Sequence, residues 1–205
     1  MTGSFPLQVV LAMGIGLSIF GLILLFFTTI EATVYALIGW FTYVVLYTMW
    51  SKRRYTWNTL IGSISGAVTP LIGWAAIAPS FQTVPIVLFL ILFIWQMPHT
   101  YAIAIKYFEE YKVAGVKMLP IVHGIVVTKR RLVVYIACLL PLSFFLGQLG
   151  MPFLIIATLM NVGWLALGIS GFLTKNDIKW ARWNFIYSVN YITLLFFMMV
   201  LVTFV

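Results

Sequence analysis

The side chains that could do chemistry gather in three short stretches between long apolar segments. The densest stretch, residues 95–111, reads WQMPHTYAIAIKYFEEY. Trp95, His99, Lys106 and Glu110 recur there at helical spacing, so one continuous helix would carry an aromatic ring, an imidazole, a cation and a carboxylate on one face. Ionisable groups within an apolar segment usually face an interior or a cavity. This face therefore predicts a binding site, whereas an aromatic belt at a membrane surface would explain Trp95 but not His99.

Carboxylates are scarce, because the chain has only four acidic residues: Glu31, Glu109, Glu110 and Asp177. The Glu109–Glu110 pair lies among lysines in the longest polar stretch. Such a pair can hold Mg²⁺ against a phosphate group, since this hard cation prefers oxygen ligands. Neighbouring residues of a helix point about 100° apart, so the two would rarely chelate one ion unaided. A solvated loop with ordinary interfacial charges is the alternative.

A second cationic stretch, residues 47–58, reads YTMWSKRRYTWN. Its consecutive cations Lys52, Arg53 and Arg54 can neutralise a diphosphate, while Thr56 and Asn58 offer hydrogen bonds. A plain cationic anchor at the membrane surface is the competing interpretation. The sequence shows no P-loop, Rossmann glycine pattern, zinc-ligand spacing or nucleophile elbow.

The elements that position these stretches have the composition of a membrane protein. Hydrophobic residues make up 63% of the chain and charged residues 8%, whereas soluble domains carry about 25% charged residues. A soluble protein of this length could not hide so much apolar surface. In a bilayer the backbone must hydrogen-bond to itself, so the apolar segments are predicted to be helices. We predict an all-α, polytopic transmembrane helix bundle, with residues 1–205 as a single domain.

Seven apolar segments approach the length of roughly 20 residues that spans a bilayer. The third segment contains Gly62 and Gly66, which permit close helix approach, and Thr69-Pro70, which predicts a kink. The predicted spans are residues 7–28, 33–50, 58–78, 84–105, 132–147, 152–173 and 183–204.

All 12 basic residues lie in three predicted loops, residues 51–57, 106–131 and 174–182. With seven spans these loops share one side of the membrane, which the positive-inside rule makes cytoplasmic. The amino terminus is then predicted inside and the carboxyl terminus outside. The net charge of +8 is therefore explained by the basic residues of the cytoplasmic loops, and we expect no nucleic-acid partner.

Long stretches of this sequence resemble the protoheme IX farnesyltransferase (haem O synthase) family, which belongs to the UbiA superfamily of membrane prenyltransferases. The resemblance is carried by residues 47–76, 94–124, 128–131 and 180–196, among them the motifs SKRRYTWN, WQMPHTYAIAIKYFEEYKVAGVKMLP, TKRR and WARWNFIYSVNYITLLF. It implies helices around a central cavity, about seven spans of a nine-helix fold. It also implies transfer of a farnesyl group from farnesyl diphosphate to a vinyl group of haem B, which gives haem O on the route to haem A.

The resemblance implies a diphosphate site at the basic loops. Glu110, preceded by Glu109, matches the family's second acidic motif and would bind Mg²⁺, although the family often has Asp at this position. Lys52 and Arg53 match a Lys-Arg pair of the family. Together with Lys106 they would act catalytically, because cations stabilise the charge that builds on a departing diphosphate.

The resemblance also implies residues that contact the substrates. Asn58 and His99 match the family's Asn and Pro-His positions, and His99 would orient or ligate haem. Trp95 and Tyr101 would line the cavity. Lys117 departs from the pattern, since the family typically has Pro there.

The family's first acidic motif and first two helices would lie upstream of residues 2–8, TGSFPLQ, so we expect the chain to lack them. A non-catalytic transporter or haem-handling protein is one alternative, because kinked, glycine-rich spans suit transport. An inactive remnant is another. We expect a bacterial cell membrane as the location, with the lipid bilayer around the bundle and a haem A synthase as a partner.

Overall fold

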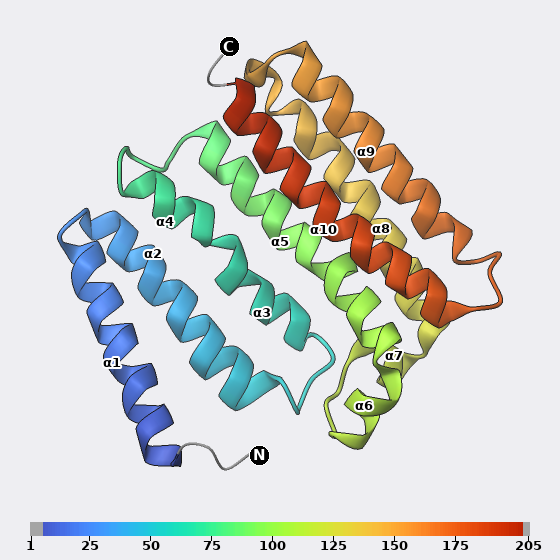
Figure 1. The fold of residues 1–205 in the computed structure, drawn as a ribbon, viewed down its shortest axis with the longest axis horizontal. Helices are drawn as coiled ribbons and strands as arrows, with labels where there is room; N and C mark the ends of the chain where they lie inside the picture. The colour runs from blue at the N-terminus through green and yellow to red at the C-terminus, as the bar shows by residue number, and fades with distance from the viewer. Residues whose placement is uncertain (1–5, 203–205) are drawn as a thin grey trace.

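The computed structural model describes residues 6–202 and folds them into helices joined by turns, as predicted (Figure 1). The kink predicted at Thr69-Pro70 is present, because one helix ends at Ala67 and the next begins at Thr69. The helices that run the length of the bundle are α1 (Leu7–Phe26), α2 (Ile30–Phe41) with its continuation η1 (Thr42–Ser51), α3 (Asn58–Ala67) with α4 (Thr69–Ala75), α5 (Thr83–Lys106), α8 (Ile125–Phe144), α9 (Met151–Ser170) and α10 (Asp177–Val202). The short helices are α6 (Phe108–Val113), α7 (Leu119–His123) and the single 3₁₀ turn η2 (Gly147–Leu149).

The chain is a multi-pass membrane protein. Within the described residues, five helical segments are long and apolar enough to cross a membrane: Leu7–Phe26, Ile30–Ser51, Thr83–Lys106, Met151–Ser170 and Asp177–Val202. The two remaining predicted spans correspond to the broken pair α3–α4 and to α8, which includes three cations.

Two of the predicted loops are partly helical, which corrects the sequence interpretation. Residues 106–131 contain α6, α7 and the first turns of α8. Residues 174–182 contain the start of α10. The charges lower the hydropathy and so suggest loops, but α8 and α10 begin before their apolar portions, and α6 and α10 have acidic residues in their first turns.

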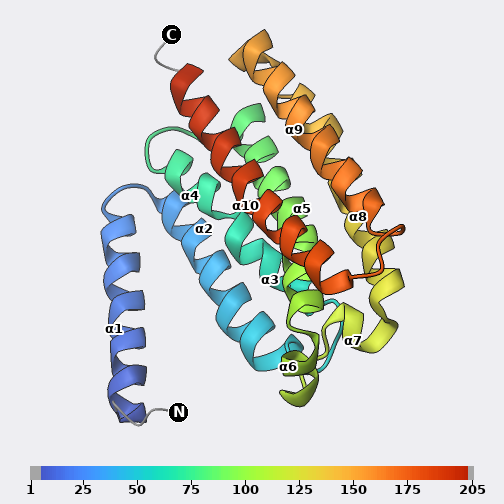
Figure 2. The same ribbon diagram turned by 45° about the vertical axis from the view of Figure 1, so that its right-hand side comes forward.

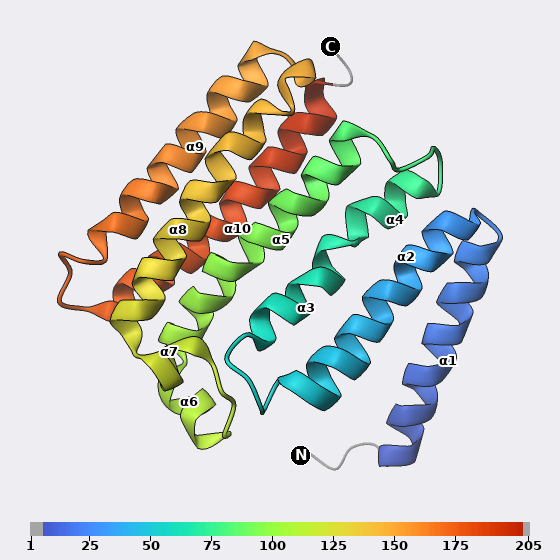
Figure 3. The same cartoon turned by 180° about the vertical axis from the view of Figure 1, so that it is seen from behind.

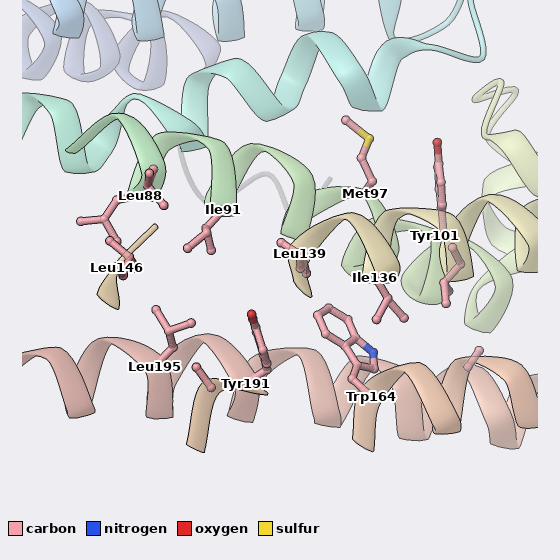
Figure 4. Packing of buried hydrophobic residues seen from close by; sticks show 14 of the residues in the cluster. Leu88, Ile91, Met97, Tyr101, Ile136, Leu139, Leu146, Trp164, Tyr191 and Leu195 are labelled. Atoms are coloured by element: carbon pink, nitrogen blue, oxygen red, sulfur yellow. The ribbon is translucent and has the colours of Figure 1, made fainter. Parts of the chain in front are cut away.

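A four-helix group of α5, α8, α9 and α10 contains the main hydrophobic core. Ile91, Met97, Ile136, Trp164 and Tyr191 lie within this core with almost no exposed surface, and Figure 4 shows side chains from α5, α8, α9 and α10 meeting there. The α3–α4 pair packs against α5, and α2–η1 packs against α3–α4. Helix α1 lies at the outer edge against α2 and buries none of its residues (Figure 2). Helix α5 is therefore the central element.

The three basic connections lie at the same end of the bundle, which agrees with the predicted arrangement (Figures 1 and 3). That end carries the turn between η1 and α3, the α6–α7 segment, and the turn between α9 and α10. The turns that follow α1, α4 and α8 lie at the opposite end. We call the first of these the basic end.

An ion pair between the buried Lys129 and the partly exposed Asp177 fastens α8 to the start of α10. Lys129 Nζ lies 2.5 Å from Asp177 Oδ1 and donates to the carbonyl of Gly171 at 2.6 Å. The ammonium also lies 5.3 Å from the centroid of the Trp180 ring. Lys129 is only 6% exposed, whereas the sequence predicted a loop cation. The pair stabilises the basic end, and it is the only ion pair within residues 6–202.

Candidate active site

Helix α5 presents three of the predicted site residues towards α10. Trp95 Nε1 donates to the carbonyl of Ser188 at 2.8 Å, and His99 Nδ1 lies 2.7 Å from Ser188 Oγ. Lys106 Nζ lies 5.7 Å from the centroid of the Phe185 ring. The structure thus brings Trp95, His99 and Lys106 together on the side of α5 that the helical spacing predicted.

An aromatic stack surrounds the imidazole of His99. Its ring lies 4.6 Å from the Trp95 ring, nearly parallel at 21°, and 5.1 Å from the Phe185 ring, measured between centroids. Lys106, two turns nearer the basic end, lies over the Tyr107 ring at 4.5 Å. Flat aromatic surfaces beside a cation provide an apolar face with one charged edge. Such a surface suits a planar ligand that carries anionic groups.

Glu110 does not continue this face, which corrects the predicted arrangement. Helix α5 ends at Lys106, and Tyr107 leaves the helical region with φ −109° and ψ 41°. Glu109 and Glu110 then lie exposed in the first turn of α6. Helical spacing failed here because no proline or glycine marks the break between Lys106 and Phe108.

Tyr101 also lies elsewhere than predicted. It faces α8, where its ring centroid is 6.1 Å from that of Tyr135, and it is only 4% exposed. A position two residues after His99 is turned by about 200° around the helix. Tyr101 therefore belongs to the core in this structure and does not line the face formed by Trp95 and His99.

Asn58 connects two loops of the basic end. Its amide nitrogen donates to the carbonyl of Lys52 at 3.1 Å and to that of Lys117 at 3.2 Å. Its oxygen accepts from Thr59 Oγ1 at 3.1 Å, and the residue is 1% exposed. Both amide protons are thus engaged, so Asn58 positions the loops and offers no free donor to a substrate, contrary to our expectation.

A polar pocket of about 220 Å³ opens on the neighbouring side of α5, and sequence reasoning missed it. The residues at its walls are uncharged hydrogen-bonding groups or glycines: Tyr43, Tyr47, Thr59, Gly62, Ser63, Ser65, Gly66, Gln96 and Thr100. From the sequence, Gly62 and Gly66 indicate only a close-packing surface. Polar residues recurring inside an apolar segment were the available signal.

Two structural features keep this pocket open. The wall formed by Tyr43 and Tyr47 belongs to η1, a π-helix of 10 residues, a form that occurs frequently at functional sites. A side-chain carbon added to Gly66 would overlap the Gln96 amide, and one added to Gly62 would lie 3.1 Å from the Tyr47 ring. Glycine at both positions leaves room for the two polar side chains.

The charged groups at the basic end fit a magnesium diphosphate better than a bare metal ion. Lys52 Nζ lies 5.6 Å from the centroid of the Tyr47 ring, beside the pocket, and Arg53 is exposed in the following turn. No three acidic, His or Cys side chains gather anywhere in residues 6–202. Mg²⁺ is commonly held by one or two carboxylates together with substrate phosphates and water. Glu109 and Glu110, exposed and without an ion pair in the described chain, fit that role.

Comparison with known proteins shows that the chain is similar to one family of membrane prenyltransferases. A profile of the UbiA prenyltransferase family matches residues 1–189. The protoheme IX farnesyltransferase of Geobacillus sp. (strain WCH70) is 58% identical over 203 residues, which cover 99% of this chain and 66% of that protein. The protein of the same name from Oceanobacillus iheyensis is also 58% identical, with 98% of this chain and 65% of that protein covered.

A third relative, protoheme IX farnesyltransferase 2 of Bacillus subtilis (strain 168), is 55% identical and is covered to 67% of its length by 99% of this chain. The chain thus spans about two thirds of the length of these curated relatives. No solved structure matches it.

Proposed function

The chain belongs to the UbiA prenyltransferase family, and from this membership we propose that it acts as a protoheme IX farnesyltransferase. The substrates would be farnesyl diphosphate and haem B, and the product haem O. The observation that carries the proposal is identity of 58% across 99% of the chain to a relative of that name. The planar aromatic face beside Lys106 and the cations of the basic end support it.

The basic end suits departure of the diphosphate. As the bond between the farnesyl carbon and the bridging oxygen breaks, negative charge builds on the leaving group. Lys52 and Arg53 would stabilise this charge, and Lys106 would contribute from the end of α5. We propose that Glu109 and Glu110 hold Mg²⁺ against the diphosphate, where the ion would supply further charge neutralisation.

The stack on α5 suits the acceptor. We propose that haem lies across the edges of the stacked Trp95 and His99 rings, with Lys106 near its anionic groups. Packed aromatic side chains exclude water, which would otherwise quench an allylic cation. The vinyl carbon then bonds to the farnesyl carbon, and the cation left on the haem side chain takes up water and releases a proton, which gives an alcohol.

Haem O production tests the proposal. The chain, joined to the part of the Geobacillus relative that it does not cover, is expressed in cells that lack their own haem O synthase, and extracted haems are separated by chromatography. We expect haem O, together with farnesyl diphosphate consumption in isolated membranes. The Geobacillus relative serves as the positive control. A non-catalytic haem transporter would bind haem and leave farnesyl diphosphate unconsumed, and that result would contradict the proposal.

We further propose that the basic end faces the cytoplasm of a cell membrane, with the amino terminus inside and the carboxyl terminus outside. An excess of Lys and Arg marks cytoplasmic loops. Reporter fusions after Arg54, Lys117 and Lys179 should all report the inside. An outside signal from any of them would defeat this orientation. A haem A synthase, which would consume the product, is the partner we propose.

A further inference from the structure

Ser188 of α10 is the point at which α5 and α10 meet in the candidate site, although nothing in the sequence singled it out. It is completely buried. Its backbone carbonyl accepts from Trp95 Nε1 at 2.8 Å, and its Oγ lies 2.7 Å from His99 Nδ1. The same hydroxyl donates to the carbonyl of Phe185 at 2.6 Å. Ser188 therefore contacts both flat side chains of α5 that form the proposed acceptor surface.

The proton of the Ser188 hydroxyl bears on which imidazole nitrogen carries a hydrogen. A serine hydroxyl has a single proton, and two acceptors lie within its reach: the carbonyl of Phe185 at 2.6 Å and His99 Nδ1 at 2.7 Å. Donation to the carbonyl, the nearer acceptor, leaves Oγ to accept from His99 Nδ1. A neutral imidazole carries one N–H. Its other nitrogen, Nε2, is left with a free lone pair, and it has no hydrogen-bond partner within residues 6–202.

The neutral ring is the form that the surroundings favour. An imidazolium inside the membrane would need an anionic partner, and all four acidic residues are engaged or located elsewhere. Glu31 accepts hydrogen bonds from Ser80, and Asp177 pairs with Lys129. The Glu109–Glu110 pair lies on α6, beyond the end of α5. The nearest charge on the same helix face is that of Lys106, which has the same sign as an imidazolium.

We infer that Ser188 is a positioning residue, which holds His99 in the Nδ1–H tautomer and so presents Nε2 as the ligand for haem iron. Histidines that bind metals through one nitrogen usually donate the other N–H to a neighbouring acceptor, which sets the tautomer and the ring orientation. Stacking on Trp95 and Phe185 restrains the ring further. The identity of the ligand rests on the proposed function, whereas the tautomer rests on the hydrogen bonds alone.

The tautomer can be measured directly, because the chain has only two histidines. Protein labelled with ¹⁵N-histidine is studied in detergent micelles by NMR, and His123, exposed on α7, is the internal control. Substitution of each histidine in turn by Gln assigns the signals. We expect His99 to show a protonated Nδ1 and an unprotonated Nε2. Ser188→Ala should abolish this pattern, whereas Ser188→Thr, which keeps a hydroxyl, should retain it.

A proton on Nε2 in the unaltered protein, or on both nitrogens, would overturn the inference. An unchanged pattern in Ser188→Ala would overturn it as well, since the tautomer would then not depend on the hydroxyl. These outcomes are independent of prenyl transfer, because the measurement needs no substrate.

Titration with ferric haem tests the ligand. The Soret band should report an imidazole-ligated iron that is lost in His99→Gln and kept in His123→Gln. Ser188→Ala should weaken haem affinity by about 10-fold or more, the usual effect of removing the partner of a metal-binding histidine, while Ser188→Thr should bind almost normally.

If haem O is formed but His99→Gln leaves the Soret band unchanged, the assignment of His99 as the iron ligand is wrong and the proposed function stands. If the histidine spectrum is as expected but the protein neither binds haem nor makes haem O, the proposed function and the ligand both fail, and only the tautomer survives.

Discussion

Replacing Glu110 by glutamine is expected to lower farnesyl transfer by roughly a hundredfold, the scale of losing one group that stabilises charge in a transition state. The substitution removes a charge and keeps the size of the side chain. Glu110 is exposed on α6 and forms no ion pair in the described chain, so the fold should tolerate the change. A hard cation such as Mg²⁺ loses affinity when a carboxylate oxygen is replaced by an amide. Initial rates at varied Mg²⁺ and farnesyl diphosphate concentrations would show both the slower turnover and a higher Mg²⁺ requirement.

Glu109→Gln is the matched control for this prediction. The two carboxylates point about 100° apart on a helix, so only one of them can contact the magnesium diphosphate directly. Because we assign that contact to Glu110, Glu109→Gln should have the smaller effect on turnover. The equivalent substitutions in the Geobacillus relative would show whether the loss of farnesyl transfer is common to both proteins or specific to this chain. Near-normal turnover in Glu110→Gln would refute the role assigned to this residue.

Removing the Asp177 carboxylate is expected to destabilise the folded protein by about 3 kcal/mol, because a buried charge is left without its partner. Lys129 would keep its hydrogen bond to the carbonyl of Gly171 and its contact with the Trp180 ring, but no anion would remain near its ammonium. Asp177 also lies in the first turn of α10, where a negative charge favours the helix. Equilibrium unfolding of Asp177→Ala in a denaturing-detergent titration would measure the loss.

The double variant Lys129→Met/Asp177→Ala tests whether the unpaired Lys129 ammonium causes the loss of stability. If the uncompensated ammonium is responsible, removal of both charges should recover part of the stability lost in Asp177→Ala. Lys179→Ala, which removes an exposed cation of the same helix, should have little effect. A double variant that is no more stable than Asp177→Ala would contradict this account.

The class of fold could be predicted from the sequence because it depends on sums over many residues. A chain with 63% hydrophobic residues and 8% charged residues has to be solvated by lipid. Backbone groups in lipid must pair within their own segment, which requires helices. The kink at Thr69-Pro70 was also predictable, since proline acts on the turn that precedes it. The shared side of the basic loops followed from counting spans between charges.

What the sequence could not supply was the identity of the neighbour on each helix face. Trp95 and His99 were recognised as unusual, but their partner Ser188 lies 89 positions away from His99 on another helix, and no local pattern links them. Similarly, Lys129 counted as a loop cation until α8 placed it beside Asp177, 48 positions further along the chain.

The sequence by itself therefore determined the membrane class, the helical passes, the common side of the charges and the set of residue types available for chemistry. These properties are local or additive, so they survive without knowledge of the contacts. Only the tertiary structure decided that Tyr101 faces the core, that the Asn58 amide donates to carbonyls of two loops, and that the Ser188 hydroxyl lies beside Nδ1 of His99. Each of these depends on the rotation of one helix against another, and that rotation is set by packing between segments that are distant in the chain.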